Sequence, residues 1–166
     1  LHAPHWGGST LLSFDWITPR DPQRGVELAA LFAAVFPGFA ERYGERLGAE
    51  VIGVGEAFGP RLASWFTSFT TPQTLVHGDY RLDNMLFATA SGPPPLTVVD
   101  WQTAALGHGP SDLAYFIGGG LLPAVRRSVE PELIERYRVG LEQEGVALTA
   151  DVLDHDYAMG SASGYV

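Results

Sequence analysis

Three oxygen-bearing side chains in the middle of the chain have types and spacing suited to metal and phosphate chemistry: Asp79, Asn84 and Asp100. An amide oxygen and a carboxylate held by rigid strands suit a hard cation such as Mg²⁺, which prefers oxygen ligands and leaves positions for water or substrate phosphates. A further carboxylate that is not committed to the metal can accept a proton from an attacking hydroxyl. Phosphoryl transfer requires this division of work.

The elements that position these side chains are two predicted strands, over 85–88 and 96–99, joined by the turn-forming residues 89–95. If the strands pair antiparallel with residue 85 opposite residue 99, Asn84 and Asp100 lie side by side at the open end of the hairpin. Asp79, five residues before Asn84, lies in the loop that enters the same end. The plainer alternative is that Asp79 caps a turn and Asp100 merely ends a strand.

The wording of these segments resembles a known family. The segment 77–84, HGDYRLDN, resembles the HGDxxxxN catalytic loop of aminoglycoside phosphotransferases and choline kinases, the counterpart of the protein-kinase catalytic loop. The segment 99–101, VDW, resembles the metal-binding aspartate of that family, and 109–115, GPSDLAY, resembles the helix start that supports the catalytic loop. Within that family, the sequence of these segments is most similar to the ecdysteroid-kinase-like branch.

The resemblance implies roles for individual residues. Asp79 would be the catalytic base, and Asn84 and Asp100 would be the Mg²⁺ ligands that hold the cofactor ATP. His77 would support the loop through hydrogen bonds of its ring. Asp112 would accept hydrogen bonds from loop amides, the alternative being an ordinary acidic residue favoured by the helix dipole. The implied partner is a small-molecule alcohol, and aminoglycosides, choline-like alcohols, sugars and steroid-like alcohols all remain open.

Two other classes of function are compatible with parts of the pattern. The first is a non-catalytic binding or interaction module that kept the fold. The second is a metal-dependent hydrolase that uses His77, Asp79 and Asp100, which would need a second metal cluster. The remaining histidines show no convincing metal-ligand spacing; they are His2, His5, His108 and His155.

Composition excludes several chemistries. The 166 residues include no cysteine, which excludes disulfides, thiolate zinc sites and cysteine nucleophiles and is compatible with a cytoplasmic protein. Ten arginines, no lysine and 19 acidic residues give a net charge of −9, which argues against a nucleic-acid partner. The acidic surface would attract a cationic substrate or simply confer solubility. We find neither a long apolar run nor a leader sequence, so no membrane association is expected.

Hydrophobic periodicity predicts a mainly helical chain. Helices are expected over 21–36, 39–47, 49–66, from Ser111 as N-cap to about 118–120, over 132–144, and after Thr149, with Pro37-Gly38 separating the first two. A short strand is expected at Leu75–Val76. Gly53, Gly55 and Gly59 hint at a nucleotide loop but lack a preceding strand, so a loose helix or turn is the better interpretation.

The predicted fold class is therefore α+β and mainly helical: the C-terminal lobe of a protein-kinase-like fold, with a small β-hairpin carrying the catalytic and metal-binding loops. We expect residues 1–166 to be a C-terminal catalytic lobe truncated at both ends. The N-terminal ATP-gripping lobe is absent from it, because kinases of this kind use a strand lysine and this sequence has none. The isolated chain is expected to be inactive.

Overall fold

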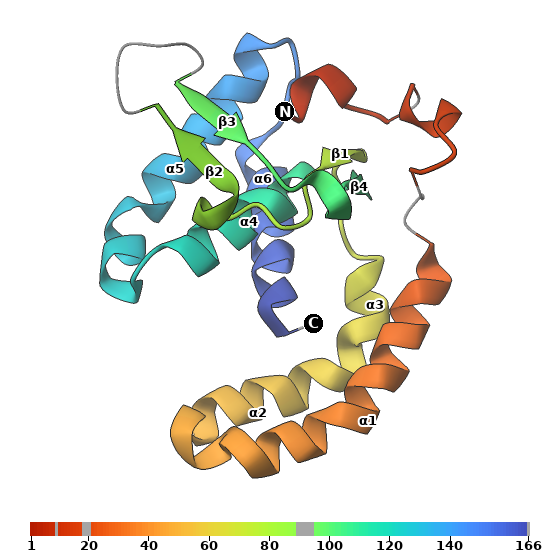
Figure 1. Cartoon of the computed structure of the whole chain (residues 1–166), viewed down its shortest axis with the longest axis vertical. Coiled ribbons are helices and arrows are strands. Elements are labelled where there is room, and N and C mark those ends of the chain that lie inside the picture. The colour runs from red at the N-terminus through yellow and green to blue at the C-terminus, as the bar shows by residue number, and fades with distance from the viewer. Residues whose placement is uncertain (9, 18–20, 89–94, 166) are drawn as a thin grey trace. The chain divides into compact units, whose positions relative to one another are not determined.

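The computed structural model, which describes residues 1–8, 10–17, 21–88 and 95–165, consists of helices and two small antiparallel sheets (Figure 1). The chain divides into two compact units, one of Leu1–Pro19 with Thr70–Gly164 and the other of Arg20–Phe69 with Tyr165–Val166. The expected mainly helical α+β class is confirmed. The loop 89–95 predicted between two strands lies, except for Pro95, outside the described residues. None of the described helices is long and apolar enough to cross a membrane.

The first unit contains all the strands of the described residues and three helices. Its elements are β1 (Thr74–Val76), β2 (Met85–Phe87), β3 (Leu96–Val98), β4 (Ala105–Gly107), α4 (Gly109–Gly120), α5 (Pro123–Gln143) and α6 (Ala150–Ser161). Strand β1 pairs with β4, and β2 pairs with β3, both antiparallel. The strands predicted near residues 75, 85 and 96 are therefore present, whereas β4 was not predicted.

The β2–β3 hairpin has a register one residue away from the predicted one. Met85 pairs with Val98, and the Val99 N–H donates to the carbonyl of Asn84 at 2.9 Å, so Val99 lies opposite Asn84 in place of Asp100. Pro95 has no N–H and can only accept a backbone hydrogen bond, which it does from Ala88 at 3.1 Å. This contact fits the observed register. The predicted pairing of Asn84 with Asp100 is therefore wrong.

Helix α4 begins earlier than expected. His108 is its N-cap residue and Gly109 its first residue, so Ser111 lies inside the first turn, where its hydroxyl donates to the carbonyl of His108 at 2.6 Å. The prediction of Ser111 as N-cap is wrong because a serine can bond to a nearby backbone carbonyl from within a helix as well as cap it. The helix ends at Gly120, within the predicted range.

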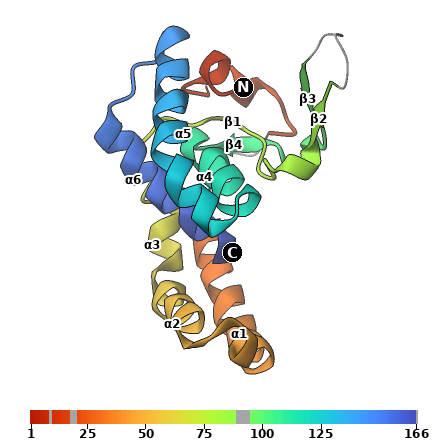
Figure 2. The ribbon, with the colours of Figure 1, turned by 90° about the vertical axis from the view of Figure 1, so that its left-hand side faces the viewer.

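Helices α4, α5 and α6 form the helical part of the first unit, and α4 packs against both of the others (Figure 2). Helix α5 starts at Pro123, where proline suits a first turn, and continues through Pro131, whereas the predicted helix begins only at residue 132. Thr149 stands at the N-cap position of α6 as predicted. The apolar core between the helices contains Ala114, Ile117 and Tyr157, with Leu133 and Ile134 packed against it.

The second unit consists of α1 (Pro22–Leu47), α2 (Ala49–Phe58) and α3 (Leu62–Phe66). Two helices were predicted on either side of Pro37, but α1 is one helix that bends near its middle (Figure 1). Proline removes one helical hydrogen bond and kinks a helix, yet the helix continues when packing holds both halves. The helix expected over 49–66 is interrupted by a 3₁₀ turn at Gly59–Arg61.

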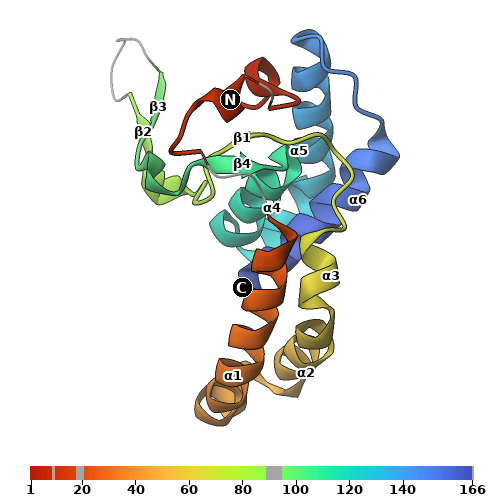
Figure 3. The same cartoon turned by 90° about the vertical axis from the view of Figure 1, so that its right-hand side faces the viewer.

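Two glycines of the supposed nucleotide loop are packing positions. Helices α1 and α2 lie side by side (Figure 3). A Cβ added to Gly55 would lie 2.4 Å from the ring of Phe36, and one added to Gly59 would lie 2.8 Å from the ring of Phe32. The two rings stack with centroids 4.8 Å apart. The glycines therefore provide room for aromatic rings, so the absence of side chains there is explained by helix packing.

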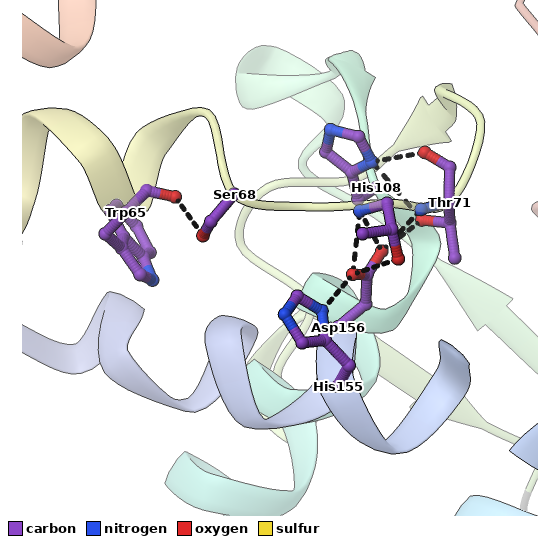
Figure 4. A network of polar contacts seen from close by, with 7 residues as sticks. Trp65, Ser68, Thr71, His108, His155 and Asp156 are labelled. Atoms are coloured by element: carbon purple, nitrogen blue, oxygen red, sulfur yellow. Dashed lines mark hydrogen bonds and ion pairs between the residues drawn. The ribbon is translucent and has the colours of Figure 1, made fainter. Parts of the chain in front are cut away.

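A buried carboxylate joins α6 to the segment that leads into β1 (Figure 4). Asp156 is fully buried and accepts hydrogen bonds from the backbone N–H and the hydroxyl of both Thr70 and Thr71, between 2.6 and 3.2 Å. The Nδ1 of His155 lies 3.0 Å from it. Burial alone would raise the pKa of Asp156, but these hydrogen bonds outweigh burial and lower it to about 2.

Candidate active site

The backbone of the loop after β1 is held from beneath by α4. Asp112 is buried, and its carboxylate accepts hydrogen bonds from the backbone N–H groups of His77 at 2.7 Å and Gly78 at 3.0 Å. Gly78 has a φ of 81°, and an added Cβ would lie 2.7 Å from the carbonyl oxygen of Thr103. Only glycine fits this position without strain, so the glycine of the HGD segment has a direct steric reason.

The ring of His77 connects this loop to the end of the hairpin. The ring is buried, its Nδ1 accepts from the backbone N–H of Asp79 at 3.3 Å, and its Nε2 lies 2.9 Å from the carbonyl oxygen of Val99. A neutral imidazole with its proton on Nε2 satisfies both contacts. The ring of Trp101 lies 4.8 Å away, centroid to centroid. His77 thus fixes Asp79 relative to the residue just before Asp100.

Asn84 is bonded directly to Asp79. The side-chain amide of Asn84 donates to the Asp79 carbonyl at 2.9 Å and to Asp79 Oδ2 at 3.0 Å. Both amide hydrogens are engaged by these contacts, which leaves the side-chain oxygen of Asn84 as the atom it can offer to a ligand. Asn84 was expected beside Asp100, and this direct bond to Asp79 was not predicted.

The carboxylate of Asp79 is partly exposed, at 22% of its side-chain surface, and is contacted from two further directions. Arg81 Nε lies 3.3 Å from Oδ2, and the hydroxyl of Tyr115 donates to Oδ1 at 3.1 Å. Burial and then the hydrogen bond to Asp79 raise the pKa of Tyr115, so its phenol remains a donor at neutral pH. The contact with Arg81 is an ion pair.

Asp100 has an unusual backbone conformation. Its φ of 64° and ψ of 60° are left-handed, and within the described ranges it is the one non-glycine residue with positive φ. Such conformations are costly and gather at functional sites. Asp100 is exposed, and no other described residue makes a hydrogen bond or ion pair with its carboxylate. The turn into the 3₁₀ segment Trp101–Thr103 therefore presents an uncommitted carboxylate one residue beyond the hairpin.

His2 also contacts this site, although no motif in the sequence pointed to it. It is buried, its Nε2 lies 3.2 Å from Asp112 Oδ2, and its Nδ1 lies 2.8 Å from the hydroxyl of Tyr137. The hydroxyl of Thr74 in β1 donates to the backbone carbonyl of His2 at 2.6 Å. His2 thus completes the polar surroundings of Asp112. No local spacing could reveal a contact between residues more than 100 positions apart.

Among the described residues, the second metal cluster that a hydrolase would need is not found. In the part of the chain that the structure describes, no group of three or more His, Cys, Asp or Glu side chains is arranged to hold a metal ion. The arrangement that does exist is a carboxylate bonded to an amide, with the uncommitted carboxylate of Asp100 on the residue that follows Val99, the backbone partner of Asn84. This arrangement suits a proton acceptor next to a cation held by one amide oxygen and one carboxylate.

Comparison with known proteins identifies the class. The sequence model of the phosphotransferase enzyme family matches residues 9–150, and the chain belongs to this family. Membership indicates kinase-like phosphotransfer as the class of chemistry.

Several curated proteins are similar over shorter stretches. Acyl-CoA dehydrogenase family member 11 of Gallus gallus is 38% identical over 58 residues, 32% of this chain and 7% of that protein. The Homo sapiens protein of the same name is 43% identical over 44 residues, 26% of this chain and 6% of that protein. Acyl-CoA dehydrogenase family member 10 of Mus musculus is 39% identical over 67 residues, 39% of this chain and 6% of that protein. The chain thus matches only a small part of the length of these relatives.

Proposed function

We propose that this chain carries the catalytic loop of an ATP- and Mg²⁺-dependent phosphotransferase that moves the γ-phosphate of ATP to a hydroxyl group of a small molecule. The observation that carries the proposal is the Asp79–Asn84 pair. Asp79 has a partly exposed carboxylate. The side-chain amide of Asn84 donates to the backbone carbonyl of Asp79 and to its Oδ2. In this arrangement the carboxylate serves as proton acceptor and the amide oxygen is left for a cation.

The residues present fit a magnesium ion. The free oxygen of Asn84 and the uncommitted carboxylate of Asp100 are hard oxygen donors, which Mg²⁺ prefers, and two protein ligands leave positions for phosphate oxygens and water. When bound, the ion would neutralise charge on the phosphates of ATP. His77 would help to hold Asn84 and Asp100 in position for the ion. Its ring forms hydrogen bonds with the backbone of Asp79 in the loop and with the backbone of Val99, the residue before Asp100.

Asp79 would act on the acceptor. Its carboxylate would accept the proton of the acceptor hydroxyl as that oxygen forms a bond to the γ-phosphorus and the bond from phosphorus to the leaving oxygen of ADP breaks. Positioning contributes most of the catalysis in phosphoryl transfer, so the hydrogen bonds from Asn84 and Tyr115 to this carboxylate are part of the chemistry. We propose a small-molecule alcohol as the acceptor.

We also propose that the groups that grip the ATP phosphates belong to an N-terminal lobe outside these 166 residues. Kinases of this kind use a lysine for the phosphates, and all ten basic residues here are arginines. The hairpin exposes apolar side chains that such a lobe or the ATP base would cover, namely Leu86 at 57%, Phe87 at 60% and Leu96 at 38%. We expect the isolated chain to transfer phosphate poorly or not at all.

The test is transfer of labelled γ-phosphate from ATP to a panel of aminoglycosides, choline-like alcohols, sugars and sterols, with the full-length protein and with the isolated chain. The proposal requires Mg²⁺-dependent transfer by the full-length protein and its loss in Asp79→Asn. The absence of lysine favours a second candidate, a non-catalytic binding module. Binding of an acceptor by the full-length protein without any transfer would support that candidate and contradict ours.

A further inference from the structure

The carboxylate of Asp79 is held from two different elements. Oδ2 is contacted from the loop itself: it accepts a hydrogen bond from the Asn84 amide at 3.0 Å and forms an ion pair with Arg81 Nε at 3.3 Å. Oδ1 receives the hydroxyl of Tyr115 at 3.1 Å, and Tyr115 lies on helix α4. Contacts on both oxygens fix the rotation of the carboxylate plane, which contacts on Oδ2 alone would leave free. Tyr115 is therefore the residue that determines where Oδ1 points.

Two residues of helix α4 form hydrogen bonds with the loop. Asp112 bonds to the loop backbone, and Tyr115, three residues later on the same face of the helix, bonds to the side chain of the proposed base. The helix itself is held by packing of Ala114 and Ile117, which are 2% and 0% exposed. Because one rigid helix carries both contacts, the backbone and the carboxylate of the loop keep a fixed relation to each other.

Oδ1 of Asp79 can accept one hydrogen bond besides the one from Tyr115. A carboxylate oxygen has two lone pairs, of which the phenol occupies one. The other lone pair is the place where an acceptor hydroxyl can donate, since Oδ2 already receives Asn84 and Arg81. The acceptor hydroxyl would therefore approach next to the phenol oxygen. The raised pKa of Tyr115, caused by burial and then by Asp79, keeps the phenol protonated and able to donate.

We propose that Tyr115 is a positioning residue for the base: its phenol orients Oδ1 of Asp79 toward the acceptor hydroxyl. This inference rests on the proposed function, in which Asp79 accepts the proton of the acceptor. It extends that function by assigning a role to a residue of α4 outside the catalytic loop.

The test in the full-length protein is Tyr115→Phe, which removes one oxygen and keeps the ring. We expect kcat to fall about 10- to 100-fold, the range of one hydrogen bond to a charged group, while the KM for Mg-ATP stays within about twofold. Tyr43→Phe removes the same atom from an exposed tyrosine of α1 and should leave kcat unchanged. A kcat for Tyr115→Phe within twofold of the parent, or an equal loss in Tyr43→Phe, would overturn the proposal.

A second measurement does not depend on phosphotransfer. With ¹³Cζ-labelled tyrosine, the phenol of Tyr115 can be titrated by NMR in the parent and in Asp79→Asn. Loss of the negative charge at position 79 should lower the pKa of Tyr115 toward the ordinary tyrosine value, because the hydrogen bond to Asp79 helps to raise it. An unchanged titration would disprove the contact. If the titration shifts but no acceptor is ever phosphorylated, the contact stands and the proposed function fails.

Discussion

The catalytic-loop region and the α1–α3 unit are held together by different kinds of contact. Around residues 77–84 the fixed points are hydrogen bonds between side chains and backbone atoms, such as those that the Asp112 carboxylate accepts from two loop amides. In the α1–α3 unit the fixed points are aromatic rings against glycines, such as Phe36 against Gly55. Hydrogen bonds depend steeply on direction, whereas apolar packing depends on volume and shape.

Because the two regions are held by different contacts, they should respond differently to substitutions that change only one or two atoms. Exchange of a carboxylate for an amide hardly changes the volume of the loop region, but it removes a charge, an acceptor or a donor at one particular point. The same kind of isosteric change in the α1–α3 unit would have little effect, because that unit has no comparable polar centre among its described residues. Conversely, one added methyl group should lower stability where it meets the ring of Phe36, and should not do so at a glycine with no atom nearby.

The largest expected effect is on catalysis. In the full-length protein, Asp79→Asn should reduce kcat by about 10²–10⁴, the usual contribution of a general base, with Mg-ATP affinity nearly intact. Asp100→Asn should instead weaken Mg-dependent nucleotide binding, because it alters a proposed metal ligand. Steady-state kinetics and nucleotide titrations would separate the two. Equal effects of both substitutions on nucleotide affinity would show that the assigned roles are wrong.

The next effect is on the support of the loop. Asp112→Ala should lower the free energy of unfolding by roughly 3 kcal/mol, because it leaves the backbone amides of His77 and Gly78 and the buried His2 ring without their acceptor. Asp112→Asn should cost less, since one acceptor oxygen remains. Urea denaturation of the chain measures both. A loss below about 1 kcal/mol in Asp112→Ala would mean that water replaces the carboxylate and that Asp112 contributes little to holding the loop.

The third effect concerns Asp156 and depends on pH. Its pKa of about 2 lies below the value of about 3.9 for an unfolded aspartate, so its contribution to stability is complete above about pH 4 and is lost as the pH falls toward 2. Asp156→Asn should therefore lower stability at pH 7 by about 2 kcal/mol and flatten the stability profile between pH 4 and pH 2.

The matched control for this prediction is Asp154→Asn on the same helix, where the carboxylate is exposed. It should change neither the stability at pH 7 nor the profile. Chemical denaturation at several pH values tests the pair, and the difference between the two variants cancels the titration of all other carboxylates. Parallel profiles for Asp156→Asn and the parent would show that the hydrogen bonds in Figure 4 do not favour the charged form.

How far the site could be predicted depends on the range of each contact. Asp79 and Asn84 lie five positions apart in one short loop, so local spacing was enough to select them. His2 and Tyr115 contact the site from distant parts of the chain, and nothing in their immediate neighbours indicates a direction. The hairpin register was predicted one residue out, because strand pairing depends on its connection and not only on the apolar pattern.

The fold was predictable where periodicity is strong. The helices were found, but Pro37 was interpreted as a break although it lies inside a continuous helix, and the helix predicted over 132–144 begins earlier, at Pro123. Proline reports only the local loss of one hydrogen bond, and tertiary packing on both sides decides whether the helix continues. The three-residue strand β4, with sequence Ala-Leu-Gly, is too short to show alternation and exists because β1 pairs with it.

The smallest expected effect tests the packing side of the comparison with two glycines of α2. In Gly55→Ala the new methyl group would lie 2.4 Å from the ring of Phe36. Overpacking costs about 1–3 kcal/mol, and the better helix propensity of alanine returns up to about 1 kcal/mol, so stability should fall by about 1 kcal/mol. In Gly53→Ala nothing lies within 4 Å of the new atom, and stability should rise by about 0.5–1 kcal/mol.

The opposite signs make this pair informative, because the two substitutions share a helix, a chemical change and an unfolded-state effect. Thermal and urea denaturation of both variants would give the signs directly. Neither should alter kcat in the full-length protein once folded, since α2 carries none of the proposed site residues. If Gly55→Ala is as stabilising as Gly53→Ala, the ring of Phe36 moves aside at little cost, and the α1–α3 unit tolerates changes of volume as well as changes of polarity.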